Sequence, residues 1–148
     1  MKNQYRQFIK QYSDCLKKGN IGILCNQVSF DPTEGKYLFQ ILKSLTDKIT
    51  LFVPEHGLFA EQQDQVLIES LDVYKPFGSS VYYESLYKNS DNKLGDLTRH
   101  LLQIDTLIID IQDVGVRYYT YVTTIAEMFK LLAVNNMNLD FKSAYQLF

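Results

Sequence analysis

Three short runs of consecutive apolar residues constrain the fold of this 148-residue chain more than any other feature. They occupy residues 21–25 (IGILC), 49–53 (ITLFV) and 106–111 (TLIIDI), and each has the length of a strand. Their apolar residues are continuous rather than alternating, which is typical of parallel strands that are covered on both faces. Residues 81–87 are a further strand candidate.

Amphipathic segments separate these strands. Residues 2–18 place apolar side chains on one helical face and lysines on the other, and similar spacing predicts helices over residues 38–45, 94–102 and 118–132. Alternation of strand and helix is the pattern of βαβ units, and it predicts an α/β fold with a mainly parallel sheet between helices. No linker divides the chain, so residues 1–148 are expected to form a single domain.

The composition argues against several classes of protein. The apolar fraction of 46% and the net charge of −2 disfavour a disordered chain and a basic nucleic-acid binder. No run approaches the roughly 18 apolar residues of a membrane span, and the charged N-terminus has no signal-peptide core. The sequence as written therefore predicts a cytoplasmic protein without a membrane span or a nucleic-acid partner.

The sequence lacks the motifs that hold metals and nucleotides. Cys15 and Cys25 have no metal-type spacing, and the two histidines form no His/Cys cluster. There is no G-x-G-x-x-G and no P-loop. A response-regulator receiver would need an acidic pair after the first strand, where this chain has Asn26 and Gln27. We therefore expect no metal and no other cofactor.

Polar loops follow three of the predicted strands. Asn26 and Gln27 come after the first strand, residues 54–57 (PEHG) after the second, and residues 110–117 (DIQDVGVR) at the end of the last. In open α/β sheets, ligands bind outside the carboxyl ends of the strands. These loops are therefore expected to converge on one site.

Glu55 is the first candidate for catalysis. Pro54 stiffens the approach to it and Gly57 allows a sharp turn, so a carboxylate at this position would be held in a fixed orientation. Partial burial would raise its pKa, which suits a general acid. The alternative is a carboxylate that satisfies backbone amides of the next segment. His56 could bind substrate, relay protons or orient Glu55.

The last loop carries two carboxylates and one arginine. A buried strand tolerates Asp110 only when it is paired, and Arg117 is the obvious partner, so an internal ion pair and direct substrate contact are both open. Asp113 lies in the loop itself. Among the tyrosines of residues 118–121, Tyr119 is the better ligand candidate, because the other two share a helical face that is expected in the core.

These loops resemble those of a known family. Asn26-Gln27, the P-E-H-G-L of residues 54–58 and the D-I-Q-D-V-G-V-R-Y-Y-T-Y of residues 110–121 are similar to motifs of the exo-β-N-acetylmuramidases (NamZ-like glycoside hydrolases, formerly DUF1343). The resemblance covers roughly residues 20–130 and implies a Rossmann-like three-layer catalytic domain. It also implies removal of terminal non-reducing N-acetylmuramic acid from peptidoglycan fragments, in cell-wall turnover and recycling.

The resemblance also assigns roles to residues. It implies that Glu55 is the catalytic glutamate, for which we expect the role of general acid, with Asp113 or Asp110 as the second carboxyl group. Arg117 suits the lactyl carboxylate of muramic acid. Family members can be exported, which keeps a periplasmic or secreted location open. The positions expected to line the substrate pocket are Asn26, Gln27, His56, Asp110, Arg117 and Tyr119.

Two features depart from the family pattern. Residues 59–61 (FAE) stand where relatives have a glycine-bearing segment, and relatives are well over twice as long. Residues 134–148 do not resemble the strand expected next, so the sheet is predicted to be truncated at the C-terminus. The family's second domain is then expected to be absent, and a separately encoded C-terminal half is expected as a partner. The alternatives to an N-terminal piece of the enzyme are a non-catalytic, sugar-binding remnant and an unrelated α/β interaction protein.

Overall fold

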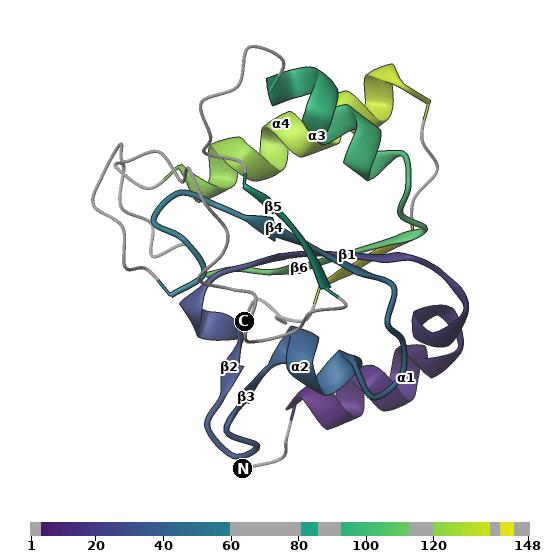
Figure 1. The fold of residues 1–148 in the computed structure, drawn as a ribbon, viewed down its shortest axis with the longest axis vertical. Coiled ribbons are helices and arrows are strands. Elements are labelled where there is room, and N and C mark those ends of the chain that lie inside the picture. Colours follow the sequence, from purple (N-terminus) through teal and green to yellow (C-terminus); the bar gives the residue numbers. More distant parts are fainter. Residues whose placement is uncertain (1–3, 60–80, 86–92, 113–119, 137–139, 144–148) are drawn as a thin grey trace.

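Five parallel strands form one sheet in the computed structural model, which describes residues 4–59, 81–85, 93–112, 120–136 and 140–143 (Figure 1). The strands lie in the order β5-β4-β1-β6-β7, and each neighbouring pair is parallel. The prediction of an α/β fold with a parallel sheet is confirmed. The bounds of the strands are β1 (Ile21–Cys25), β4 (Ile49–Val53), β5 (Val81–Ser85), β6 (Thr106–Asp110) and β7 (Asp140–Ser143).

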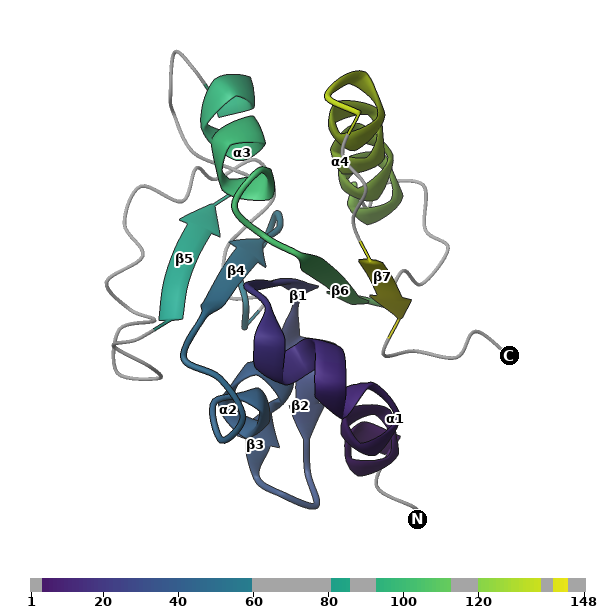
Figure 2. The same ribbon diagram turned by 90° about the vertical axis from the view of Figure 1, so that its right-hand side faces the viewer.

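Helices cover both faces of this sheet. α1 (Gln4–Lys18) and α2 (Leu38–Leu42) lie on one face, and α3 (Lys93–Leu101) and α4 (Tyr121–Val134) lie on the other (Figures 1 and 2). The central strands are therefore enclosed from two sides, and all five residues of β1 are buried. This enclosure explains why the strand sequences are continuously apolar. Among the described helices, none is long and apolar enough to cross a membrane.

The strand order contains one reversal of direction. From β1 the chain moves outward through β4 to β5, and it then returns to the other side of β1 to form β6 and β7. The connections after β1 and after β6 therefore leave the sheet in opposite directions. Ligands of open α/β sheets bind at the carboxyl edge beside such a switch point, which here lies between β1 and β6.

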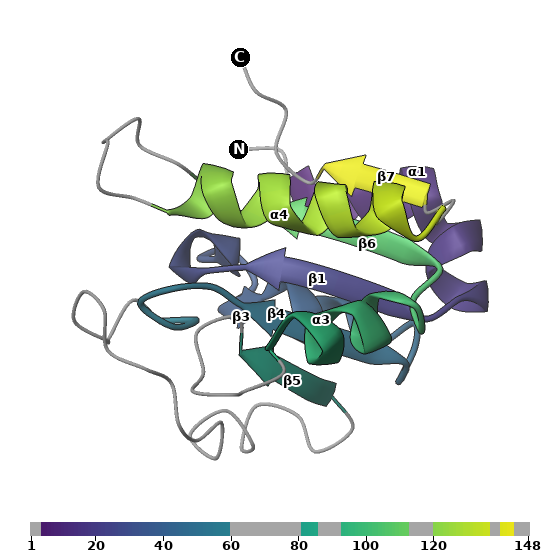
Figure 3. The same ribbon diagram turned by 90° about the horizontal axis from the view of Figure 1, so that it is seen from above.

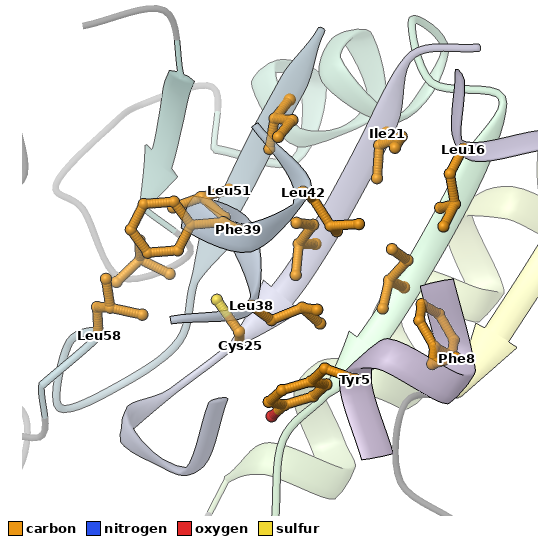
Figure 4. Packing of buried hydrophobic residues seen from close by; sticks show 14 residues of the cluster. Tyr5, Phe8, Leu16, Ile21, Cys25, Leu38, Phe39, Leu42, Leu51 and Leu58 are labelled. Carbon is orange, nitrogen blue, oxygen red and sulfur yellow. The ribbon is translucent and has the colours of Figure 1, made fainter. Parts of the chain in front are cut away.

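Two hydrophobic clusters join the layers. Ile21, Ile23 and Cys25 of β1 belong to the cluster on the α1–α2 face, whereas Leu24 belongs to the cluster on the α3–α4 face. This alternation follows from the period of two residues in a strand. Figure 4 shows the first cluster, in which side chains of α1 and α2 pack against the sheet. Burial of apolar side chains on both faces stabilises the sheet through the hydrophobic effect.

Gly22 lies under closely packed side chains on the α3–α4 face. A Cβ atom at this position would lie 2.5 Å from Ile104 Cδ1 and 2.9 Å from Phe52 Cε2. The missing side chain lets the Phe52 ring and Ile104 pack directly over β1. The glycine is therefore required by packing rather than by a turn.

The C-terminal tail differs from the sequence prediction. β7 pairs with β6 over four residues, with Leu107 beside Phe141 in the register. The expectation that residues 134–148 provide no strand was wrong. A strand at the edge of a sheet is held by main-chain hydrogen bonds to a single neighbour, so it does not need the continuous apolar sequence of a central strand.

The loop after β1 contains more structure than expected. It forms the short helix η1 (Gln27–Ser29) and the antiparallel strands β2 (Phe30–Asp31) and β3 (Lys36–Tyr37). Asp31 Oδ1 accepts hydrogen bonds from the main-chain nitrogens of Thr33 (2.8 Å) and Glu34 (3.3 Å), which closes the turn between these strands. Aspartate commonly organises turns in this way.

Candidate active site

Three side chains that we expected in the site lie at the carboxyl edge of neighbouring strands. β4, β1 and β6 are adjacent, and Cys25 pairs with Asp110 in the register. Asn26 follows β1 directly, and Glu55 lies two residues beyond the end of β4. Figure 3 shows η1, the loop after β4 and the start of α4 gathered at this edge. Asn26, Glu55 and Asp110 are all buried.

Glu55 is held by a residue from the other side of the switch point. Only 2% of its surface is exposed, and its Oε2 accepts a hydrogen bond from Thr120 Oγ1. Thr120 immediately precedes α4, so this bond connects the loop after β4 to the connection between β6 and α4. A buried carboxyl group with a hydroxyl donor has a fixed position, which general acid catalysis requires.

The turn that carries Glu55 has an unusual backbone. His56 and Gly57 both adopt positive φ angles, of 69° and 81°, and the Gly57 nitrogen donates a hydrogen bond to the Pro54 carbonyl (3.2 Å). The predicted sharp turn at Gly57 is confirmed. Glycine adopts this conformation at no steric cost, but a histidine does so at a cost of about 1 kcal/mol. Non-glycine residues with this geometry are concentrated in functional sites.

Asp110 is completely buried at the end of β6. Its Oδ2 accepts a hydrogen bond from the Tyr5 hydroxyl (2.8 Å), and its main-chain carbonyl accepts one from Ser29 Oγ (2.7 Å). Its Oδ1 has no hydrogen-bond partner within the described part of the chain. Burial raises the pKa of Asp110, and the hydrogen bonds from Tyr5 and Ser29 oppose this rise only in part.

Asn26 shows a similar pattern on the neighbouring strand. Its Oδ1 accepts a hydrogen bond from the Val28 nitrogen (3.2 Å) and so caps η1, whereas its Nδ2 has no partner among the described residues. A buried donor or acceptor without a partner costs about 1–3 kcal/mol. Adjacent strand ends thus carry one unused donor, on Asn26, and one unused oxygen, on Asp110. Gln27, the next predicted ligand residue, is exposed.

Cys25 lies beside this site but is unsuited to nucleophilic chemistry. Burial raises the pKa of its thiol, and the negative charge of Asp110 raises it further. The reactive form of cysteine is the thiolate. The side chain therefore acts as a small apolar residue of the core.

Several predicted site residues lie outside the described residues. They are Asp113, Arg117 and Tyr119, so their roles, and the ion pair suggested between Arg117 and Asp110, stay predictions. Tyr118 also lies outside them, whereas Tyr121 is buried in α4 as expected. Over the described ranges, no group of three His, Cys, Asp or Glu side chains is arranged to hold a metal ion.

Three residues that contact the candidate site, Tyr5, Ser29 and Thr120, are not among those predicted from the sequence. Tyr5 belongs to the amphipathic segment of residues 2–18, and a buried tyrosine hydroxyl needs a hydrogen-bond partner, which is a usable signal. Ser29 carries no such signal, because small hydroxyl residues are common in loops, whereas Thr120 lies within the motif of residues 110–121 that resembles the family. Their contacts to Asp110 and Glu55 join segments 81 and 65 residues apart.

The fold and the site together define a Rossmann-like α/β protein with buried carboxyl groups at the switch point of its sheet. The family model described as exo-beta-N-acetylmuramidase NamZ, N-terminal, matches residues 21–140. The chain therefore belongs to the NamZ family. It is 34% identical over 120 residues to the peptidoglycan beta-N-acetylmuramidase NamZ of Bacillus subtilis (strain 168), covering 80% of this chain and 27% of that protein.

Two solved structures share the fold. A DUF1343 family protein from Bacteroides fragilis NCTC 9343 matches 96% of this chain and 34% of its own, with a TM-score of 0.65 and 24% identity. A second DUF1343 protein from that organism matches 93% and 33%, with a TM-score of 0.61 and 27% identity. The chain thus spans about a third or less of the length of these relatives.

Proposed function

We propose that this chain supplies the catalytic carboxyl group of a glycoside hydrolase site that removes terminal non-reducing N-acetylmuramic acid from peptidoglycan fragments. The observation that carries the proposal is the buried Glu55 carboxyl, fixed by Thr120 at the carboxyl edge of the sheet. Membership of the NamZ family and the name of the Bacillus subtilis relative support the substrate class. Cell-wall turnover or recycling is the corresponding physiological role.

The proposed chemistry assigns one step to each carboxyl group. Glu55 donates its proton to the glycosidic oxygen as the bond to the anomeric carbon breaks. A second carboxyl group, from Asp113 or Asp110, either attacks the anomeric carbon or activates water. The separation of the two carboxyl groups, about 5 Å or 6.5–9.5 Å, distinguishes retention from inversion.

The remaining predicted residues supply binding. In this proposal Arg117 pairs with the lactyl carboxylate, since a guanidinium binds a carboxylate through two hydrogen bonds. Asn26, His56 and Tyr119 contribute further polar contacts to the sugar. Residues 1–148 then form one N-terminal catalytic domain, which works with the remaining part of a family-length protein.

Hydrolysis of a chromogenic β-N-acetylmuramide tests the enzymatic role. We expect Glu55→Gln to lower the rate about a hundredfold or more, because the amide cannot donate the proton. Glu127→Gln is the matched control, because Glu127 is exposed on α4, and it should leave the rate unchanged. Measurable hydrolysis at equal rates by the chain and its Glu55→Gln variant would contradict the assignment of Glu55.

A sugar-binding module without turnover is the second candidate. It is favoured by two buried polar atoms, Asn26 Nδ2 and Asp110 Oδ1, which have no partner among the described residues and could bind a sugar without proton transfer. Chemical-shift changes on addition of N-acetylmuramic acid, without release of product, would support it. Absence of both binding and turnover would contradict both functions and favour an α/β interaction protein.

A further inference from the structure

Tyr5 connects the N-terminal helix to the candidate site. It lies on α1, 105 residues before Asp110, and only 2% of its surface is exposed. Its hydroxyl donates to Asp110 Oδ2 at 2.8 Å. The family model begins at residue 21, so α1 lies before the segment that carries the family match. The contact thus joins a residue outside the matched segment to one inside it.

We propose that Tyr5 is a positioning residue of the active site, whose hydroxyl fixes the Asp110 carboxyl group at the end of β6. The proposal rests on the proposed function. Ser29 already engages the main-chain carbonyl of Asp110, and Tyr5 engages Oδ2. Within the described residues Oδ1 has no hydrogen-bond partner, which leaves it for a ligand or for a group that moves when a ligand binds.

The fold by itself does not require this pair. The Tyr5 ring packs in the cluster on the α1–α2 face beside Phe8, where a phenylalanine ring would fill the same space. Burial of the Asp110 carboxyl group carries a desolvation penalty, and apolar residues at both positions would remove it. The hydrogen bond between Tyr5 and Asp110 therefore points to a role in the candidate site rather than in the core.

The test is Tyr5→Phe in the full chain, with Tyr12→Phe as the matched control. Tyr12 lies on the same helix, and its hydroxyl accepts a hydrogen bond from Gln11 (3.0 Å). We expect Tyr5→Phe to raise the pKa of Asp110 in a carboxyl ¹³C NMR titration, because a donor to the charged form is lost. Binding of N-acetylmuramic acid should weaken about tenfold, and Tyr12→Phe should change neither quantity.

Each outcome decides between the two proposals. An unchanged Asp110 pKa and unchanged binding in a folded Tyr5→Phe variant would overturn the positioning role. A raised pKa without any binding by the wild-type chain would support the contact and contradict the proposed function. If Tyr5→Phe does not fold, the ¹³Cζ chemical shift of Tyr5 in the wild-type chain tests the contact instead. This shift should change with pH at the same midpoint as the Asp110 carboxyl group. A Tyr5 shift that does not follow Asp110 would refute the contact.

Discussion

Asp110 shows how the burial of one carboxyl group makes folding depend on pH. Its carboxyl group is completely buried, and Tyr5 provides its side-chain hydrogen bond among the described residues. Burial raises the pKa of this group, so the folded chain binds its proton more tightly than the unfolded chain. The stability contributed by Asp110 is therefore complete below the unfolded pKa of about 4 and is lost as the pH rises through the folded pKa.

Asp110→Asn is expected to stabilise the protein at neutral pH. Asparagine resembles the neutral acid and keeps an oxygen for the Tyr5 hydroxyl, so the variant does not lose stability as the pH rises. Urea denaturation should give a gain of about 1 kcal/mol at pH 7 that disappears toward pH 3. Asp14→Asn, at an exposed position of α1, is the control. A less stable Asp110→Asn variant at pH 7 would contradict this account.

The two cysteines are expected to differ in reactivity. Cys25 is fully buried with a raised thiol pKa, whereas Cys15 is partly exposed on α1. Iodoacetamide at pH 8 should therefore modify Cys15 and leave Cys25 intact until denaturant is added. Mass spectrometry of the labelled peptides gives the two rates. Similar rates in the native protein would show that the end of β1 is more open than the structure indicates.

Helices and strands could be predicted from the sequence where the pattern of apolar residues matches the burial of those residues in the fold. β1, β4 and β6 are buried on both faces, and their continuous apolar runs identified them from the sequence. β7 was missed because an edge strand is defined by its ladder to β6 and not by its side chains. β2 and β3 were missed because two-residue strands carry no periodic signal.

The candidate site was predictable to the same extent. The sequence placed Asn26, Glu55 and Asp110 at strand ends, and topology then brings these ends together. The residues that hold the carboxyl groups could not be found in this way, since Thr120 and Tyr5 come from helix starts distant in the sequence. Pairing between side chains depends on the packed arrangement, whereas burial depends mainly on local pattern.

Gly22→Ala tests the packing of β1 against the α3–α4 face. The new methyl group would collide with Phe52 and Ile104, and overpacking of a core costs about 1–3 kcal/mol. Gly35→Ala provides the contrast, since no atom lies within 4 Å of its Cβ position and its penalty arises from the positive φ of 64°. Urea denaturation of both variants should show the larger loss for Gly22→Ala, and a neutral result there would contradict the packing.

At the scale of the whole molecule, β1 is the central strand of the sheet. It has β4 and β5 on one side and β6 and β7 on the other, and helices cover both of its faces (Figures 1 and 2). Opening its hydrogen bonds requires disruption of the sheet and both clusters. Amides of β1 should therefore exchange with solvent deuterium most slowly, and those of β5 and β7 fastest among the strands. Faster exchange in β1 than in β7 would contradict this order.

The bond from Thr120 to Glu55 has a consequence for biosynthesis. It joins positions 65 residues apart, and the bond from Tyr5 to Asp110 joins positions 105 apart. The ribosome must therefore release residues 1–120 before Glu55 can accept the hydrogen bond from Thr120, and residues 1–110 before Asp110 can accept the one from Tyr5. Contacts of such long sequence separation form late, after their loop-closure entropy has been offset by other contacts. A nascent chain would accordingly bury its first strands well before the two carboxyl groups of the candidate site are held in place.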